Sequence, residues 1–493
     1  MANEGKAEKR RENSNTEILK IGEQPFRPSL AASLIIVGYL IISMAAAIFY
    51  LDQKLHVTML TAFGVAVLVL TIEKCPYSKV EEAILEGSKL AVPTILILYS
   101  IGCLMGAWIA SGTVPMIIYW GLKLINPSIF LVTACLACVI TSLATGSSWS
   151  TIGTVGVALI GVGMGLEINP AMTAGAIVSG AAFGDKMSPL SDTTNVAPAV
   201  AEGDLFDHIK AMVYTAGPGI VIALVAFFVL GMKHGGSADT ETVSAILAAL
   251  ESQFHLNIIT LIPPVLVIVL AVMKKPALPT LLISGIVAAA IAIFMQGETL
   301  PSIANIMENG YVSETGFADI DSLLSRGGLF SMNYTSSLTI IVMVYGSLLE
   351  KLGVLEVVLE KLKVLTRTVG SLVCTTVVTA ILVNLITASQ YMSIVLPGRM
   401  FVSEYKKKDM LPQTLSRTLE DSGTVTSLLI PWNLCGSFAS TTLGVSCIAY
   451  LPFSVFNWIV PIIAIIYGFT GKFQWKTGEI PSRKTYRPIE KSE

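Results

Sequence analysis

Two stretches that interrupt long apolar runs carry the side chains best suited to bind a small cation. They lie at 145–148 and 185–195, and their oxygen-bearing candidates are Thr145, Ser147, Ser148, Asp185, Ser188, Asp192, Thr193, Thr194 and Asn195. Carboxylate, hydroxyl, amide and backbone carbonyl oxygens are the ligands that hard cations prefer. We therefore predict a Na⁺ site here, with Asp185 and Asp192 as its charged ligands.

The second half of the chain holds a similar set of oxygen-bearing residues. The candidates there are Thr387, Ser389, Gln390, Glu420, Asp421, Ser422, Thr424 and Asn433. Two carboxylates again stand beside hydroxyls and amides, so we count these residues as candidate cation ligands as well.

Each charged candidate also has a purely structural explanation. Asp185 and Lys186 could form an ion pair at a helix end, Asp192 could cap a helix, and the acidic residues 420–421 could pair with Arg417. Asp185 and Asp192 are seven positions apart, which places both on one face of an unbroken helix, but a proline lies between them. Ionisable residues within apolar sequence are costly in a membrane and usually functional, which favours the binding hypothesis.

The composition is that of an integral membrane protein. Of 493 residues, 53% are hydrophobic and 13% charged, and the mean hydropathy is +0.72, whereas soluble domains carry roughly 25% charged residues. The net charge of −2 gives no basic field for nucleic acid. The lipid bilayer is therefore the expected surroundings of the chain.

Apolar stretches long enough to span a bilayer recur along the chain. They lie near 30–51, 56–72, 90–110, 210–231, 258–273, 278–295, 330–349 and 441–468. Two further apolar regions, 128–200 and 370–438, are broken by Gly, Pro, Ser, Thr, Asn and Asp. The polar lead before the first stretch is too long for a signal peptide, so we predict a cytoplasmic N-terminus.

The two sides of the chain contain matching segments. Leu, Thr, Ser and Ile of 143–152 recur in 385–394 at an offset of 242 positions, and 183–191 aligns with 419–427 at an offset of 236. Such self-similarity indicates two homologous halves.

Charge bias predicts that these halves face opposite sides of the membrane. The loop at 73–79 contains Lys74 and Lys79, whereas the equivalent loop, 296–321, holds five acidic residues and neither Lys nor Arg. The stretch 406–408 and the tail from Lys472 are basic, which is typical of cytoplasmic segments. Equivalent loops on opposite sides define an inverted repeat.

The predicted fold class is therefore an all-α polytopic membrane protein made of two inverted-topology repeats. We expect about ten full spans plus two hairpins, re-entrant or spanning, with helices broken at the membrane midplane. The predicted segments are a disordered cytoplasmic N-terminus (1–28), a first transmembrane repeat (29–232), an extracytoplasmic linker (233–257), a second repeat (258–470) and a basic cytoplasmic tail (471–493).

Other chemistries find little support in the sequence. Cys135 and Cys138 have no second pair or histidine nearby, and the four histidines lie at span edges or in loops. Gly146-Ser147-Ser148 lacks the partners of a catalytic serine. No phosphate-binding Gly-x4-Gly-Lys-Ser/Thr sequence occurs, so transport would be driven by ion gradients. We predict neither an enzyme nor a cofactor.

The sequence resembles the NhaC-type Na⁺/H⁺ antiporters of bacteria, in the ion transporter superfamily, from about residue 28 to 475. The resemblance rests on TGSSWSTIGTVG from Thr145, GDKMSPLSDTTNVAP from Gly184 and IPWNLCGSFASTTLGV from Ile430. It implies a scaffold and a transport domain with two re-entrant hairpins, usually in a homodimer. It also implies Na⁺ and H⁺ as substrates, exchanged by alternating access, and a place in the bacterial inner membrane with both termini in the cytoplasm.

Two other functions stay open at this point. Relatives within the resembled family exchange malate and protons for lactate and sodium, but near the broken regions only Arg399 and Arg417 offer the guanidinium group that suits a carboxylate substrate. An ion channel or membrane receptor is less favoured, because neither needs paired breaks in two halves.

Overall fold

The computed structural model describes residues 26–51, 54–234, 240–273, 275–314, 321 and 324–476. Within these residues the regular secondary structure is helical, apart from one isolated β-bridge between Met410 and Lys476. Nine of the described helices are long and apolar enough to cross a membrane, or up to eleven if each of two bent pairs counts as one span. An all-α polytopic membrane protein is therefore confirmed. The predicted N-terminal segment and basic tail lie mostly outside the described residues.

The first half runs from α2 to α11. Its helices are α2 (Leu30–Phe49), α3 (Leu55–Ile72), α4 (Tyr77–Ala110), α5 (Thr113–Leu124), α6 (Phe130–Thr145), α7 (Ser148–Thr151), α8 (Val157–Gly165), α9 (Pro170–Met187), α10 (Asp192–Val200) and α11 (Leu205–His234). A π-helical turn, Ile152–Gly156, joins α7 to α8.

The second half runs from α12 to α25. Its helices are α12 (Thr240–Gln253), α13 (Ile262–Val272), α14 (Ala277–Met295), α15 (Leu300–Asn309), α17 (Asn333–Lys351), α18 (Val354–Leu362), α19 (Val369–Thr387), α20 (Gln390–Lys407), α21 (Pro412–Leu419), α22 (Val425–Ser427), α23 (Leu434–Leu443), α24 (Cys447–Tyr450) and α25 (Val455–Thr470). A second π-helical turn, Glu420–Thr424, lies between α21 and α22.

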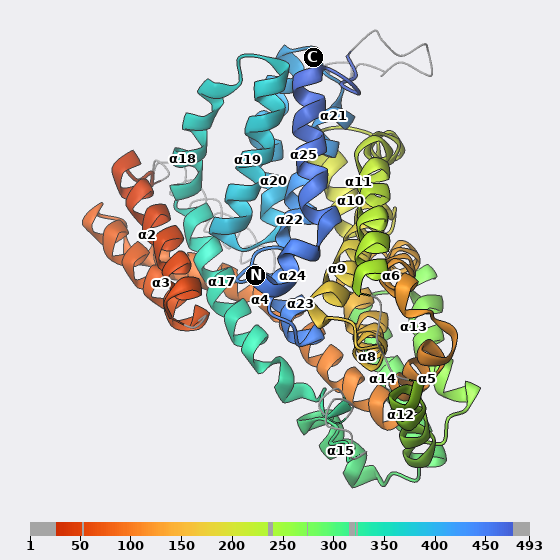
Figure 1. The fold of residues 1–493 in the computed structure, drawn as a ribbon. Helices are drawn as coiled ribbons and strands as arrows, with labels where there is room; N and C mark the ends of the chain where they lie inside the picture. The colour runs from red at the N-terminus through yellow and green to blue at the C-terminus, as the bar shows by residue number, and fades with distance from the viewer. Residues whose placement is uncertain are drawn as a thin grey trace, which may run out of the picture.

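The long helices α4 and α17 pack closely where they cross. A Cβ atom on Gly87 of α4 would lie 2.6 Å from the carbonyl oxygen of Met343 in α17, so only glycine allows this approach. Small residues at such crossings are typical of membrane helices. Figure 1 shows α2 and α3 beside α17 on one flank, and α6, α9 and α11 on the other.

The helices α2 and α3 form an antiparallel pair held at its ends. Ser29 caps α2 through its hydroxyl, and its backbone N–H and Oγ donate to the carboxylate of Glu73, which follows α3, at 3.0 and 2.8 Å. These hydrogen bonds lower the pKa of the Glu73 carboxyl. The pair buries its inner face against α17 and α18, while Ile42 and Phe49 are exposed, as expected for a lipid-facing surface.

Both helices that precede the predicted hairpin tips end in the same way. Gly146, after α6, and Ala388, after α19, adopt left-handed φ values of 67° and 51°. The next residues, Ser147 and Ser389, are extended, and each hydroxyl accepts from the backbone N–H three residues on. These matching breaks are 242 positions apart, the offset of the sequence match. The inverted relation of the halves stays a prediction.

Two segments differ from the sequence expectation. The apolar run 441–468 is not one straight span, because α23 ends at Leu443, Gly444 adopts a left-handed φ of 68°, and the next helical segment, Cys447–Phe453, lies at 92° to α23. The polar insert at 233–257 contains the helix α12, whose described face packs Ile246 and Leu250 into the core. Turn residues hidden in apolar sequence explain the first difference, and amphipathic spacing explains the second.

Candidate functional site

The centre of the site is the carboxylate of Asp185, two residues before the last residue of α9. It is buried, with 7% of the residue exposed. Oδ2 accepts a hydrogen bond of 2.6 Å from Ser148 Oγ, at the start of α7, and Oδ1 accepts one of 2.6 Å from Ser191 Oγ, just before α10. The ends of three helices therefore converge on one buried carboxylate, and both of its hydrogen-bonding partners are neutral hydroxyls.

Neighbouring hydroxyl and amide groups hold the break between α9 and α10 in place. Thr194 Oγ1 donates to the carbonyl oxygens of Asp185 and Lys186, at 3.1 and 2.9 Å. Ser188 Oγ donates to the Leu143 carbonyl at 2.8 Å, which ties this break to α6. Asn195 Nδ2 donates to the carbonyls of Pro189 and Ser191, at 3.0 and 2.7 Å. These side chains satisfy backbone groups that the broken helix leaves open.

Asp192 occupies a different environment from Asp185. It is exposed and forms the first residue of α10, where a negative charge is favourable at the positive end of the helix. Thr193 follows it and is buried, with its hydroxyl 3.1 Å from Ser191 Oγ. The two aspartates thus lie on opposite sides of the break, one buried and one exposed.

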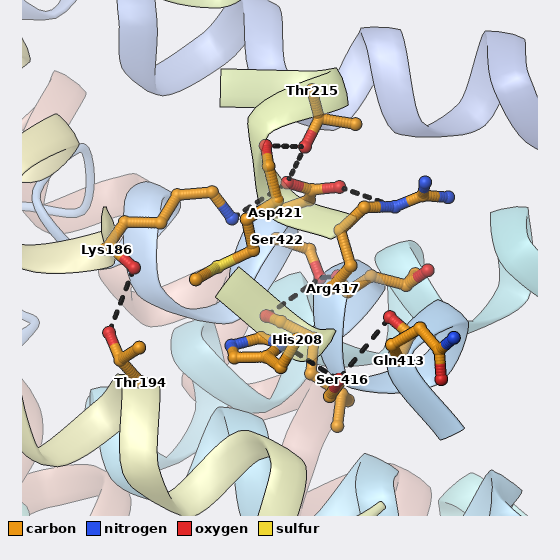
Figure 2. Close-up of polar contacts among 12 residues, drawn as sticks. Lys186, Thr194, His208, Thr215, Gln413, Ser416, Arg417, Asp421 and Ser422 are labelled. Carbon is orange, nitrogen blue, oxygen red and sulfur yellow. Dashed lines mark hydrogen bonds and ion pairs between the residues drawn. The ribbon is translucent and has the colours of Figure 1, made fainter. Parts of the chain in front are cut away.

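A buried charge network joins the two halves through Lys186, the residue that follows Asp185 (Figure 2). Lys186 Nζ lies 2.8 Å from Asp421 Oδ1, and both side chains are fully buried. Thr215 Oγ1 on α11 donates to the same oxygen at 2.7 Å. Arg417 Nε lies 3.6 Å from Asp421 Oδ2. Asp421 therefore faces two cations, and Lys186 pairs with it rather than with its neighbour Asp185.

Arg417 has further partners besides Asp421. One guanidinium N–H donates to the Phe473 carbonyl at 2.8 Å, and the guanidinium carbon lies 5.1 Å from the centre of the Trp475 ring. On the other side of α21, His208 Nδ1 lies 2.8 Å from Ser416 Oγ, as Figure 2 shows. The arginine thus ties α21 to the segment that follows α25.

Glu420 lies in the same buried region as Asp421. The residue is fully buried, and its carboxylate makes no close ion pair in the described part of the chain. Thr193 and Thr424 lie close to it, and Lys186 and Asp185 are within electrostatic reach. The predicted alternative, in which Arg417 pairs with the acidic residues 420–421, therefore applies to Asp421.

In the second half, side-chain amide groups stabilise the break after α19 and the π-helical turn Glu420–Thr424. Asn384 Nδ2 donates to the Gly423 carbonyl at 2.6 Å, and Asn433 Nδ2 donates to Asn384 Oδ1 at 3.1 Å. Gln390 Nε2 reaches the Thr424 carbonyl at 3.4 Å. Asparagine and glutamine side chains thus donate hydrogen bonds to backbone carbonyls of the buried π-helical turn that carries Glu420.

The two breaks meet through an aromatic residue and a cysteine. Trp149 Nε1 donates to Cys435 Sγ at 3.4 Å, and that thiol donates to Gln390 Oε1 at 3.3 Å. Trp149 also stacks on Phe438, with ring centres 4.7 Å apart. The candidate residues of both halves therefore border one region.

Several predicted hydroxyls are engaged within their own segments. Ser422 Oγ and Thr387 Oγ1 each donate to the carbonyl four residues before them, at 2.6 and 2.8 Å, and Thr145 Oγ1 donates to the Ser147 carbonyl at 3.4 Å. No group of three His, Cys, Asp or Glu side chains that could hold a metal occurs among the described residues. Binding of a monovalent cation by these oxygens stays a prediction.

The sequence analysis missed some residues of this region. Asn384 and Trp149 were not singled out, although each is a polar or aromatic residue next to a break. Lys186 was considered only as a partner of Asp185. A lysine inside an apolar helix is itself a signal of a buried acidic partner.

Paired helix breaks around buried carboxylates, in a protein with many apolar helices, define the class of gradient-driven membrane transporters. The family model described as the Na⁺/H⁺ antiporter family matches residues 8–194 and 180–472. The chain belongs to this family.

Individual relatives match over nearly the whole chain. A "Na(+)/H(+) antiporter NhaC" of Alkalihalophilus pseudofirmus is 39% identical over 446 residues, which is 90% of this chain and 96% of that one. A "Malate-2H(+)/Na(+)-lactate antiporter" of Bacillus subtilis is 37% identical over 451 residues, 91% of this chain and 96% of that one. A second "Na(+)/H(+) antiporter NhaC", also of Bacillus subtilis, is 39% identical over 400 residues, 80% and 88% of the two chains.

Proposed function

We propose that this protein exports Na⁺ from a bacterial cell in exchange for H⁺, by alternating access of one site at Asp185. The observation that carries the proposal is the environment of this carboxylate. It is buried at the meeting point of three helix ends and accepts hydrogen bonds from two hydroxyls. The family and the two NhaC relatives support the same function.

Competition between the two ions would couple their fluxes. A buried carboxylate whose hydrogen-bonding partners are neutral is stabilised by a bound cation or a bound proton. Na⁺ would take oxygens of Asp185 and of the neighbouring hydroxyl groups, and a proton would displace it. Because the site carries one ion or the other between the two sides, net movement of Na⁺ requires opposite movement of H⁺.

Exchange of organic acids is the second candidate, because a malate/lactate antiporter is nearly as similar to this chain as the NhaC relatives. A carboxylate substrate needs compensating positive charge. The buried cations near the breaks, Lys186 and Arg417, are already paired with Asp421. This pairing favours a cation as the substrate.

The remaining features of the proposal concern the whole assembly. We place both termini in the cytoplasm and the halves in inverted orientation, because the loops differ in charge as described above. A homodimer in the bacterial inner membrane is the arrangement that the family resemblance implies. Asp192 and the other candidate oxygens of both breaks stay part of the proposed site.

Proteoliposomes with an acidic lumen and a pH-sensitive dye test this function. We expect external Na⁺ to collapse the pH gradient with no organic acid present. An equal concentration of choline serves as the control for ionic strength. If the gradient collapses only when lactate accompanies the external Na⁺ and malate is enclosed in the acidic lumen, the organic-acid exchanger replaces this proposal.

A further inference from the structure

Glu420 is a fully buried candidate ligand to which the proposed mechanism assigns no role of its own. Its carboxylate makes no close ion pair in the described part of the chain, and the hydrogen-bonding groups near it include the neutral hydroxyls of Thr193 and Thr424. Arg417, one turn earlier on the same helical segment, pairs with Asp421. Leaving a buried carboxylate without a partner is costly, so such a group requires a cation or a proton close to it.

The surroundings of Glu420 point toward Asp185. Thr193, at the start of α10, lies close to the Glu420 carboxylate, and its hydroxyl is 3.1 Å from Ser191 Oγ, which donates to Asp185. Thr424, one turn along the chain, also places its hydroxyl close to the Glu420 carboxylate. Hydroxyl and carboxylate oxygens from both halves thus gather at one place.

The buried charges of this region do not cancel. They comprise the carboxylates of Asp185, Glu420 and Asp421 and the cations Lys186 and Arg417, all at most 7% exposed. His208 on α11 is buried and faces the same two cations, which disfavours a third positive charge. Tyr405 on α20 faces Arg417 and is a neutral phenol. Asp192 is exposed to solvent and is not counted. Three negative and two positive charges leave one negative charge in excess.

We propose that Glu420 is the second carboxylate of the site and shares one exchangeable cation with Asp185. This inference rests on the proposed function. One Na⁺ or one proton neutralises the excess charge, whereas two protons would leave a buried positive charge in its place. Exchange therefore moves one Na⁺ for one H⁺ and carries no net charge across the membrane.

The charge balance is tested with the full chain in proteoliposomes. A K⁺ gradient with valinomycin imposes a membrane potential of either sign, and the initial rate of Na⁺-driven proton movement is measured. We expect the same rate at both signs of the potential. A rate that rises several-fold with one sign and falls with the other overturns the one-for-one exchange, while an absence of any Na⁺-driven proton movement refutes the proposed function instead.

The role of Glu420 is tested with Glu420→Gln, which removes the charge and keeps the size of the side chain and an oxygen that can accept from Thr193 or Thr424. We expect the Na⁺ concentration for half-maximal exchange to rise by about tenfold or more, and Glu420→Asp to recover part of that loss. Glu202→Gln, at an exposed ion pair with Lys406, is the matched control and should behave like the unmodified protein. A monodisperse size-exclusion profile shows that each variant is folded. Unchanged Na⁺ dependence in a folded Glu420→Gln protein refutes the assignment.

Discussion

Asp185 and Asp421 are both buried carboxylates, but their partners differ in charge. Asp185 accepts hydrogen bonds from Ser148 and Ser191, whereas Asp421 lies against Lys186 and near Arg417. The first arrangement leaves a negative charge that an ion can neutralise, and the second supplies its own counter-charges. At the scale of residues, the structure thus distinguishes a carboxylate suited to exchange from one suited to holding helices together.

Asp185→Asn should abolish Na⁺/H⁺ exchange, because the amide keeps the size of the side chain and removes the charge. Asp192→Asn should raise the half-maximal Na⁺ concentration by a smaller factor, because Asp192 is exposed and screened by solvent. Both are measured by dye-monitored exchange in proteoliposomes. Asp207→Asn, an exposed residue of α11, serves as the control. Near-normal exchange in Asp185→Asn contradicts the proposed site.

Asp421→Asn should destabilise the fold strongly, because it leaves Lys186 and Arg417 buried without their partner. We expect a loss of roughly 3–5 kcal/mol, seen as a lower thermal unfolding temperature in detergent. Adding Lys186→Met should make the double variant less destabilised than the sum of the two single variants. The exposed pair of Lys406 and Glu202 gives the comparison, with less than about 1 kcal/mol expected. Additive losses at the buried pair argue against the coupling.

At the scale of elements, the breaks after α6 and α19 determine where the site forms. Gly146 and Ala388 turn the chain in left-handed conformations, and the following serines cap the next helices. A Cβ atom on Gly146 would lie 2.7 Å from the backbone of Leu190, in the break that precedes α10. The break after α6 therefore packs directly on the break between α9 and α10, and a change in one should disturb the other.

Gly146→Ala should cost stability, because it combines an unfavourable left-handed alanine with this close contact. The expected loss is roughly 1–3 kcal/mol, with slower exchange as well. Ala388→Gly is the reciprocal change and should alter stability by at most about 1 kcal/mol, since glycine adopts the same backbone without strain. Thermal unfolding of the two variants compares them. Equal stability of Gly146→Ala and the unmodified protein rules out the strained contact.

Local sequence predicted these elements better than it predicted their contacts. The spans of α2, α3 and α14, and the breaks near 146 and 388, follow from apolar length and from Gly, Ser and Thr content. The ion pair of Lys186 and Asp421 joins residues far apart in sequence, and no local pattern specifies such a pair. Likewise, whether Arg417 pairs with Glu420 or Asp421 depends on how the π-helical turn directs each side chain.

At the scale of the whole molecule, α4 relates the two faces of the protein. Its 34 residues extend over about 50 Å, longer than the hydrocarbon core of a bilayer. Exposed Ser78 lies at its start, and the loop that carries exposed Val312 follows α15, which packs near the other end of α4, at Gly106. The predicted inverted topology would place these two positions on the cytoplasmic and outer faces.

Single cysteines at Ser78 and Val312 should therefore react from opposite sides. In intact cells we expect a membrane-impermeant maleimide to label Val312→Cys, and to label Ser78→Cys only after the membrane is opened. The unmodified protein is the control, because its seven free cysteines are buried or half-buried. Labelling of both positions from the same side contradicts the inverted repeat.

The most direct test of competition at Asp185 is proton release by the purified protein. The unmodified chain and its Asp185→Asn variant are placed in detergent at low buffer capacity, near neutral pH, and Na⁺ is added while the pH is recorded. We predict release of about one proton per chain from the unmodified protein and none from Asp185→Asn, because the cation must displace a proton from a shared carboxylate. Saturable Na⁺ binding without proton release, or the same release from both proteins, would contradict the account.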